Sequence, residues 1–352
     1  MKVGMIGCGA IANGGHLPFY AANDKVEVKY FCDVIPERAE ASRGQFGSQD
    51  SRVTADYREV LADPEIQAVS VCMPNSAHAE ISIAAMRAGK DVLCEKPAAR
   101  TYAEALEMQR VQRETGRILN IGVVNRFNDH VNAIKQYIDQ GKLGEVFHVY
   151  VSFRTHRGIP GLGGAFTTRA VSGGGTLIDR GVHYLDIVMY CLGDPRPRTV
   201  TGEAFCKLGR DMKNYVYRSM WAENTMDLNG TYDVDDSVTG MIRTEGPVIT
   251  FNGAWAQNIG EDETYIDFMG DRGGIRLSYG STFKIYTTEN GALVEYVPEI
   301  KARNHFENEI NAFVDCVESR EKLPSNIDTV ILTAQMIQAI YDSSELHREI
   351  VL

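Results

Sequence analysis

The chain has 352 residues, enough for two domains with sizeable cores, and its 24% charged and 44% hydrophobic residues are typical of a globular protein. Its formal net charge of −11 disfavours nucleic acid or an anionic membrane surface as a partner. No apolar run reaches the roughly 18 residues that a membrane helix needs, and the N-terminus lacks the basic and apolar regions of a signal peptide.

The N-terminal stretch has the pattern of a dinucleotide-binding unit. Val3–Ile6 is a short apolar run, the glycine-rich segment Gly7–Ala12 follows it, and a predicted helix leads to a second apolar run that ends before Asp33. Gly7 permits a tight turn, and Gly9 has no side chain to block a pyrophosphate at the helix N-terminus. Asp33 follows the segment by 21 residues, near the spacing of roughly 20 expected for an acid that binds ribose hydroxyls. We expect dinucleotide binding here; the alternative is a plain βαβ core unit.

Strands and helices alternate between residue 26 and residue 124. Apolar runs predict strands at 26–32, from 53, at 68–73, at 91–94 and at 118–124. Helices are predicted at 36–45, 57–61, 79–87 and 101–114. This alternation is typical of a doubly wound parallel sheet, in which ligands bind beyond the carboxyl ends of the strands. We therefore expect the site to include residues at those ends: Gly9, Asp33, Asn75 and Lys96.

Lys96 lies directly after a predicted buried strand, in the sequence Glu95-Lys96-Pro97. The proline stiffens the turn and so restricts where the lysine can point. We interpret this lysine as functional; the alternative is a solvated lysine on a surface loop.

The pattern changes after residue 124, where a helix at 132–140 precedes a series of strands. Strands are predicted at 145–154, 198–206, 236–244, 247–256, 263–269, 273–278, 281–287 and 293–297. Consecutive strands with hairpin signals and few helices between them indicate an antiparallel sheet. The sequence thus predicts an α/β protein, with a Rossmann domain at 1–124 and an α+β domain at 125–352 that has a large open, mainly antiparallel sheet.

The glycines Gly173–Gly175 open a predicted helix that runs to about Leu192. Besides a buried apolar stripe, one face of this helix carries four polar side chains at spacings of four, three and four: Asp179, His183, Asp186 and Tyr190. One interpretation is a metal site, although no further His or Cys cluster supports it. A second is a core histidine held by one of the aspartates. The third is a general base, His183, oriented by a carboxylate, because histidine titrates near neutral pH.

Two further features of the second half are open to several interpretations. Four basic residues near the glycine-rich approach either bind an anionic or polyhydroxylated substrate or pair with surface carboxylates: Arg154, His156, Arg157 and Arg169. Aromatic residues in and just after the connection 211–231 suit stacking on sugar faces, a subunit contact or core packing: Tyr215, Tyr217, Trp221 and Tyr232.

The seven cysteines are scattered and form no CxxC pair. Several of them fall in predicted buried strands. We interpret them as reduced core thiols of a cytoplasmic protein, and we expect no metal bound through them.

Taken together, these motifs resemble the Gfo/Idh/MocA family, the group of glucose–fructose oxidoreductase and inositol dehydrogenase. The matching segments span the chain: Gly7-Cys8-Gly9-Ala10-Ile11-Ala12, Pro74-Asn75 with His78, Glu95-Lys96-Pro97, Gly173-Gly174-Gly175 with Asp179 and His183, Val234-Asp235-Asp236, and His305-Phe306 to Phe313. The resemblance implies NAD(P)-dependent hydride transfer at a secondary alcohol of a sugar or cyclitol. It also implies that the open sheet is a subunit interface.

The resemblance further implies the site residues. Catalysis is expected from Lys96, Asp179 and His183. The cofactor is expected to be NAD rather than NADP, held by Gly7, Gly9, Ala10, Ile11, Asp33, Arg38, Pro74, Asn75, His78, Glu95 and Lys96. Substrate contacts are expected from Lys96, Arg126, Arg154, His156, Asp179 and His183. The Lys96–Pro97 bond is expected to be cis, because the turn must aim the lysine over the nicotinamide.

Two other functions stay open at this point. A related enzyme can use NAD for transient sugar oxidation and cleave a glycosidic bond by elimination, with no net redox change. A non-catalytic regulator would only sense the nucleotide, and the presence of both Lys96 and His183 argues against it. We expect the protein to be a cytoplasmic homo-oligomer, a dimer or tetramer. We expect it to bind a small sugar or cyclitol, and to bind neither nucleic acid, membrane nor metal.

Overall fold

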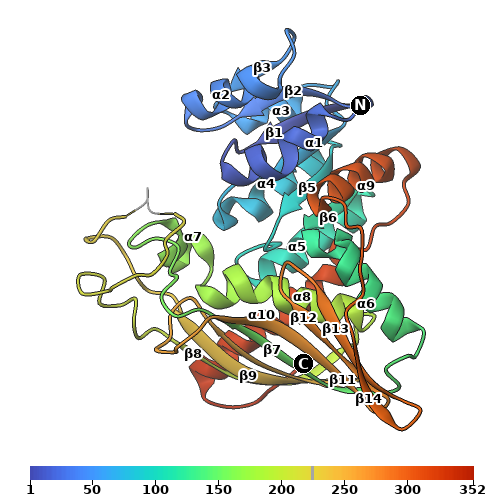
Figure 1. Ribbon diagram of the computed structural model, residues 1–352. Coiled ribbons are helices and arrows are strands. Elements are labelled where there is room, and N and C mark those ends of the chain that lie inside the picture. Colours follow the sequence, from blue (N-terminus) through green and yellow to red (C-terminus); the bar gives the residue numbers. More distant parts are fainter. Residues whose placement is uncertain (223–225) are drawn as a thin grey trace. The chain divides into compact units, whose positions relative to one another are not determined.

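The computed structural model describes residues 1–222 and 226–352, which form two compact units (Figure 1). The first unit comprises Met1–Asn128 and Arg303–Ile331, and the second comprises Asp129–Ala302 and Leu332–Leu352. The chain therefore returns to the first unit late in the sequence. The pattern of apolar residues did not indicate this return.

The first unit is built on a six-stranded sheet in the order β3-β2-β1-β4-β5-β6, with parallel pairing throughout. Its strands are β1 (Lys2–Ile6), β2 (Glu27–Cys32), β3 (Arg52–Thr54), β4 (Ala68–Val71), β5 (Asp91–Glu95) and β6 (Leu119–Gly122). Its helical elements are η1 (Ala12–His16), α1 (Leu17–Ala21), α2 (Pro36–Phe46), α3 (Tyr57–Ala62), α4 (Asn75–Arg87), α5 (Tyr102–Thr115), η2 (Val124–Phe127) and α9 (His305–Ser319). The predicted doubly wound sheet is confirmed, in the strand order of a dinucleotide-binding fold.

Burial and capping explain why these segments form these elements. Every residue of β4, β5 and β6 is buried, as expected for parallel strands covered on both faces. The helix α5 begins where the Thr101 hydroxyl accepts a hydrogen bond from the Glu104 N–H, and it ends at Gly116 with φ of +63°. The helix α9 begins where the Asn304 side chain accepts a hydrogen bond from the Phe306 N–H.

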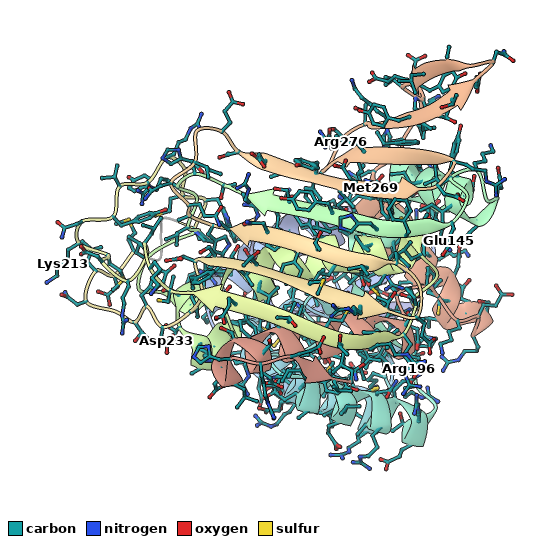
Figure 2. All side chains as sticks on the ribbon, turned by 90° about the horizontal axis from the view of Figure 1, so that it is seen from below. Glu145, Arg196, Lys213, Asp233, Met269 and Arg276 are labelled. Carbon is teal, nitrogen blue, oxygen red and sulfur yellow. The ribbon has the colours of Figure 1, made fainter. Side chains whose placement is uncertain are left out.

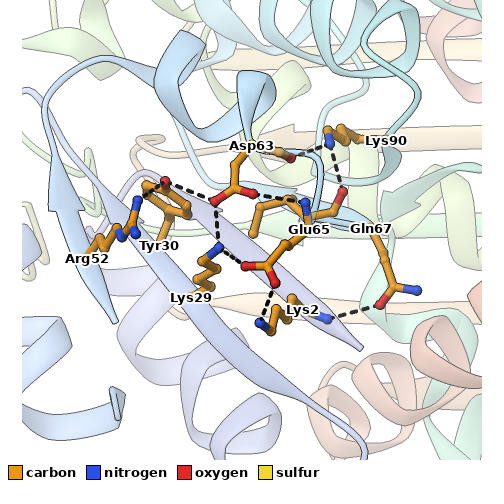
Figure 3. Close-up of polar contacts among 9 residues, drawn as sticks. Lys2, Lys29, Tyr30, Arg52, Asp63, Glu65, Gln67 and Lys90 are labelled. Carbon is orange, nitrogen blue, oxygen red and sulfur yellow. Dashed lines mark hydrogen bonds and ion pairs between the residues drawn. The ribbon is translucent and has the colours of Figure 1, made fainter. Parts of the chain in front are cut away.

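A network of polar side chains lies near the amino ends of β1, β4 and β5, the edge opposite to the one that binds ligands in this fold (Figure 3). Lys29 of β2 donates to Asp63 at 2.7 Å and also pairs with Glu65. The buried Lys90 donates to the carbonyl oxygens of Asp63 and Ile66 at 2.7 and 2.8 Å. The hydrogen bond from Lys29 is the main cause that lowers the pKa of Asp63 to about 2. These contacts join loops to strands, so we interpret them as structural.

The second unit contains a nine-stranded sheet in the order β14-β13-β12-β11-β7-β10-β9-β8-β15. Its strands are β7 (Val146–Arg154), β8 (Pro197–Phe205), β9 (Ser237–Thr244), β10 (Val248–Ala254), β11 (Glu263–Gly270), β12 (Gly273–Ser278), β13 (Phe283–Glu289), β14 (Ala292–Tyr296) and β15 (Ile350–Val351). Among the strand pairs that the structure describes in this second sheet, only the β7–β10 pair is parallel. The predicted open, mainly antiparallel sheet is confirmed, and β15 was not predicted.

One face of this sheet forms the larger core. Side chains of α6 (Asp129–Asp139), α8 (Val182–Cys191) and the C-terminal part of α10 (Ile327–Leu346) pack on it, with Val151, Phe251 and Phe268 from the strands. Figure 2 looks onto the other face, where Met269 and Arg276 project from neighbouring strands. The helix α10 has residues in both units. In the described part of the chain, no helix is long and apolar enough to cross a membrane.

Candidate active site

The glycine turn after β1 has the shape that a dinucleotide needs. Gly7 has φ of +93°, and a side chain there would overlap the carbonyl oxygen of Cys72. At Gly9, by contrast, no described residue beyond its two chain neighbours has an atom within 4 Å of where a Cβ would stand. The helical segment that begins at Ala10 therefore presents its N-terminus to open space, where Ala10 and Ile11 are exposed. This space suits the pyrophosphate of NAD, because helix N-termini offer N–H donors and a positive dipole end.

Two side chains brace the turn. The Asn13 amide donates to the carbonyl oxygens of Cys8 and Gly9, both at 2.9 Å. One carboxylate oxygen of Asp33 accepts the Cys8 N–H and the other accepts the Ile35 N–H, both at 2.8 Å. A carboxylate has about four acceptor positions, so Asp33 keeps capacity for ribose hydroxyls. Asn13 was not predicted from the sequence, because the glycine motif does not specify the residue that binds the carbonyl oxygens of the turn.

The carboxyl end of β4 contributes a second helix N-terminus beside the first. Pro74 precedes α4 and is exposed, and Asn75 at its start is partly exposed. Because β1 and β4 are neighbours where the strand order reverses, both helix starts flank the crevice where dinucleotides bind in such sheets. His78, one turn into α4, is instead buried with 1% of its surface exposed. Arg38 is exposed on α2, which follows Asp33.

The end of β5 separates the roles of two adjacent residues. Glu95 turns into the core, where one carboxylate oxygen lies 3.0 Å from Nε2 of the fully buried His16 and the other accepts the Lys96 N–H at 3.0 Å. Burial alone would raise the pKa of Glu95, but the His16 hydrogen bond and nearby positive charges outweigh it and lower that pKa. The side chain of Lys96 stays partly exposed. The Lys96–Pro97 bond is cis, so that prediction is confirmed.

His16 reaches Glu95 from η1, which is a π-helical turn inside the first helix. Its other ring nitrogen lies 3.2 Å from the Ser70 hydroxyl of β4. A second π-helical turn, η4 (Leu177–Gly181), carries Asp179 in the other unit. Such turns are frequent at functional sites. Sequence periodicity predicted neither, because one extra residue in a turn is too small a change in the pattern.

In the second unit, Asp235 anchors the start of the helix that carries the candidate base. Its carboxylate accepts the Gly175 N–H at 2.7 Å, the Leu177 N–H at 2.9 Å and the Tyr341 hydroxyl at 2.8 Å. A side chain at Gly175 would overlap the backbone oxygen of Asp235, so only glycine fits there. Burial raises the pKa of Asp235, although these three donors act in the opposite direction.

The four polar residues predicted on one helix face have different environments. Asp179 and His183 are partly exposed, while Ile178, Val182 and Leu185 around them are buried. The remaining two face neighbouring helices. Asp186 is 1% exposed and accepts a hydrogen bond from Thr333 at 3.3 Å, and the Tyr190 hydroxyl donates to Asn132 at 2.7 Å.

Asp179 has a partner that sequence reasoning missed. The indole N–H of Trp255, which follows β10, donates to the Asp179 carboxylate at 3.0 Å. Trp255 itself is 1% exposed. The only signal in the sequence was a tryptophan at a strand end, which is ordinary for a core residue.

The candidate substrate residues outside these groups have protein partners. Arg126 in η2 is 1% exposed and donates to the Pro324 carbonyl oxygen at 2.8 Å and to Thr329 at 3.2 Å. Arg154 at the end of β7 pairs with Glu263, and the backbone N–H of His156 donates to Asp262 at 2.8 Å. Their contact with substrate stays a prediction.

The aromatic connection is partly a small core. Tyr215 and Tyr232 pack with Trp255, whereas Trp221 is 66% exposed and meets the edge of Phe166 with ring centroids 4.7 Å apart. Residues 223–225 of this connection lie outside the described residues. Within the described chain, no group of three or more His, Cys, Asp and Glu side chains is arranged to hold a metal ion.

The predicted site residues thus gather in two sets, one in each unit. Gly9, Asp33, Asn75 and Lys96 lie at or just beyond the carboxyl ends of strands in the first unit. Asp179 and His183 share one helix of the second unit.

Two family models match the chain. "Oxidoreductase family, NAD-binding Rossmann fold" matches residues 1–123, and "GFO/IDH/MocA C-terminal domain" matches residues 131–276. A D-glucoside 3-dehydrogenase of Escherichia coli (strain K12) is 31% identical over 348 residues, which is 98% of this chain and 95% of that protein. A levoglucosan dehydrogenase of Pseudarthrobacter phenanthrenivorans is 27% identical over 316 residues, 84% of this chain and 74% of that protein.

Solved structures show the same fold. A levoglucosan dehydrogenase in complex with NADH has a TM-score of 0.87 at 21% identity, covering 100% of this chain and 98% of that one. An aldose–aldose oxidoreductase from Caulobacter crescentus, complexed with glycerol, has a TM-score of 0.82 at 22% identity, covering 100% and 99%.

Proposed function

The chain belongs to the Gfo/Idh/MocA oxidoreductase family, and we propose that it is a dehydrogenase that oxidises a secondary alcohol of a sugar, glycoside or cyclitol with NAD. The relatives named above act, by their names, on a D-glucoside and on levoglucosan. The observation that carries the proposal is the pair Asp179 and His183, kept partly exposed on a helix whose neighbouring side chains are buried. A histidine beside a carboxylate is suited to accept the hydroxyl proton.

The residues of the first unit fit NAD. The N–H groups at Ala10 and Ile11 would hold the pyrophosphate beside Gly9, and Asp33 would accept hydrogen bonds from the ribose hydroxyls. When bound, NAD supplies the acceptor for the hydride that leaves the carbinol carbon. The protein's own task is to hold the alcohol and to manage its proton.

Three side chains carry that task. His183 accepts the hydroxyl proton, and Asp179 orients the imidazole and offsets the charge it gains. The ammonium group of Lys96 binds the hydroxyl oxygen and stabilises the negative charge that develops there as the proton leaves. Asn75, His78, Glu95, Arg38 and Pro74 support the cofactor side of the site, and Arg126, Arg154 and His156 the substrate side.

The first test is turnover. The purified protein is incubated with NAD and a panel of D-glucosides, other sugars and inositols, and NADH is followed by absorbance. On the best substrate, His183→Ala should lower turnover by roughly 10²–10⁴, the usual worth of a positioned general base. Lys96→Ala should lose at least as much, because charge stabilisation is lost. NAD affinity should stay within a few-fold in His183→Ala.

The control is the pH profile of oxidation. The fall in rate at low pH, where a protonated imidazole cannot accept the hydroxyl proton, should vanish in His183→Ala. Near-normal turnover in this variant would mean that the histidine is structural, and the proton would need another acceptor. The same assays separate the glycosidase alternative, since release of free sugar from a glycoside without net NADH would show hydrolysis.

Assembly and location belong to the same proposal. The protein forms a homo-oligomer through the open face of its second sheet and acts in the cytoplasm. Tyr286 and Leu293 near one end of that sheet, 40% and 92% exposed, support the first statement. Seven free cysteines, of which only Cys206 is not buried, support the second, because reducing compartments keep thiols free.

A further inference from the structure

We propose that Trp255 is a positioning residue whose indole N–H fixes the Asp179 carboxylate beside His183. The inference rests on the proposed function, because it assigns a task to Trp255 only if Asp179 serves the reaction. It goes beyond that function in naming a residue outside the family motifs quoted above.

The contact is short and specific. The indole Nε1 of Trp255 lies 3.0 Å from Oδ2 of Asp179, within the range of a good N–H···O hydrogen bond. An indole N–H can only donate, and Trp255 is 1% exposed, so a buried donor without an acceptor would be costly. The donor and acceptor therefore hold each other. With Oδ2 fixed, rotation of the carboxylate about its own axis is restricted.

The backbone of Trp255 is held on both sides. Its N–H donates to the Asp236 carbonyl oxygen at 2.9 Å. Its own carbonyl oxygen accepts the Gly158 N–H and the Thr155 hydroxyl, both at 2.7 Å. The backbone from which the indole extends is therefore held in place, as is required of a residue that positions another side chain.

The ring is held by a small separate core. Buried side chains around it are Ile159, Leu162, Val234 and Ala256, and partly buried ones include Met212, Tyr215 and Tyr232. The last three lie between β8 and β9, in or just after the aromatic connection 211–231. The Asp236 carboxylate accepts the N–H groups of Lys207 and Gly209, which follow β8 just before that connection, at 2.8 and 2.9 Å. The aromatic connection thus packs the indole that holds Asp179.

A purely structural role is the alternative, in which Trp255 fills space and Asp179 only satisfies its N–H. The two roles predict different effects on turnover when the indole N–H is removed. Trp255→Phe keeps an aromatic ring in the core but removes the donor. A positioning role predicts that turnover falls by about 10- to 100-fold, the worth of a hydrogen bond to a charged group, while KM and NAD affinity stay within about threefold. A structural role predicts lower stability with turnover unchanged in the folded fraction.

Trp221→Phe is the matched control, because Trp221 is the only other tryptophan and is 66% exposed. It should leave turnover within about twofold, as surface substitutions usually do. A second variant covers the case in which Trp255→Phe does not fold. A tryptophan analogue that has sulfur in place of the indole N–H is incorporated into Trp221→Phe protein, where it replaces Trp255 alone. The analogue removes the donor and keeps the shape of the ring.

A double-mutant cycle with Asp179→Asn decides whether Trp255 acts through Asp179. Positioning predicts that Trp255→Phe costs little further turnover once Asp179→Asn is present. Independent, multiplying losses would overturn the inference. In Trp221→Phe protein, the emission of the remaining Trp255 should also change on Asp179→Asn, because the N–H loses a charged acceptor; unchanged emission would overturn it as well.

The failures are distinguishable. If Asp179→Asn loses turnover but neither Trp255→Phe nor the sulfur analogue does, the inference is wrong and the proposed function stands. If Asp179→Asn keeps full turnover, the role proposed for Asp179 is wrong, and the positioning role of Trp255 falls with it.

Discussion

Asp33 has two tasks for one carboxylate, because it braces the glycine turn and is expected to bind ribose hydroxyls. Its oxygens already accept the N–H groups of Cys8 and Ile35. A 2′-phosphate would face this carboxylate and be repelled, whereas a 2′-hydroxyl can donate to it. Discrimination between NAD and NADP therefore depends on a residue that is also part of the turn.

We predict that Asp33→Ser relaxes the preference for NAD. The ratio of kcat/KM for NADP to that for NAD should rise by about tenfold or more, the worth of removing one charged hydrogen-bonding partner. NAD affinity should fall as well, because serine cannot bind both backbone N–H groups. Adding Arg38→Ala to Asp33→Ser should reduce the gained NADP activity, since Arg38 is the nearby cation. Comparable use of both cofactors by the unaltered protein would contradict the assignment.

His78 shows how a side chain can be assigned a charge from geometry alone. Its ring nitrogens lie 2.7 Å from the Pro97 carbonyl oxygen and 2.8 Å from the Met73 carbonyl oxygen. A carbonyl oxygen cannot donate, so hydrogen bonds at both nitrogens require hydrogen on both, and we expect the ring to be an imidazolium. Burial alone would lower the pKa of His78, but neighbouring Cys94 and the two carbonyl oxygens outweigh it and raise the pKa to about 9.

This charge predicts a pH dependence of stability. The folded-state pKa of about 9 lies above the ordinary 6.5, so the contribution of His78 is complete below pH 6.5 and is lost as pH rises through 9. Denaturant unfolding should give a free energy that falls across this window in the unaltered protein and less so in His78→Gln. NMR at pH 7 should show hydrogen on both ring nitrogens. A neutral ring at pH 7 would refute the prediction.

At the scale of elements, the segment Asp233–Asp236 organises the helix that carries Asp179 and His183. Asp235 binds the N–H groups of Gly175 and Leu177 and the Tyr341 hydroxyl. Asp233 accepts the Arg169 N–H at 2.7 Å and is exposed. Neighbouring carboxylates thus offer a matched pair, one buried at the helix start and one at the surface.

We predict that Asp235→Asn destabilises the protein by about 1–3 kcal/mol, because the new amide group opposes N–H donors in a buried place. Turnover should fall too, since the start of the helix that carries the catalytic pair loses its anchor. Asp233→Asn should cost less than about 1 kcal/mol and leave turnover unchanged. Thermal unfolding and steady-state kinetics on both variants check this; equal effects would show that burial of Asp235 is not what matters.

At the scale of the whole molecule, the nine-stranded sheet has one face that does not carry the core of its unit (Figure 2). The other face of the sheet carries the core. The open face carries Met269, Arg276 and Tyr286 from neighbouring strands. Arg276 stacks 4.2 Å from the Tyr265 ring centroid and pairs with Asp267. A surface of aromatic and paired charged side chains suits contact with a second copy.

We predict a dimer or tetramer by light scattering at micromolar concentration. Tyr286→Glu should shift the mass toward the monomer, because a charge would be buried without a partner. Leu106→Glu is the control, because Leu106 is 41% exposed on α5 of the first unit and Tyr286 is 40% exposed on the sheet. A monomeric unaltered protein, or equal effects of both substitutions, would rule out this interface.

The sequence by itself determined those features whose cause is local. Consecutive strands joined by hairpin signals predicted the antiparallel sheet of β7 to β14, and apolar runs with intervening helices predicted the parallel sheet. Gly7 predicted the turn, and Gly9 the space for a pyrophosphate, because backbone freedom and the lack of a side chain are properties of the residue itself. The positions of Lys96 and of the pair Asp179 and His183 followed from the same local signals.

Only the tertiary structure decided which distant residues hold these positions. Asp235 meets Gly175 across 60 residues of sequence, and Trp255 meets Asp179 across 76. The return of 303–331 to the first unit is of the same kind. These contacts leave no periodic pattern, because each joins single side chains brought together by packing of the whole sheet. The physical reason is that a hydrogen bond depends on distance in space, whereas a sequence pattern records only distance along the chain.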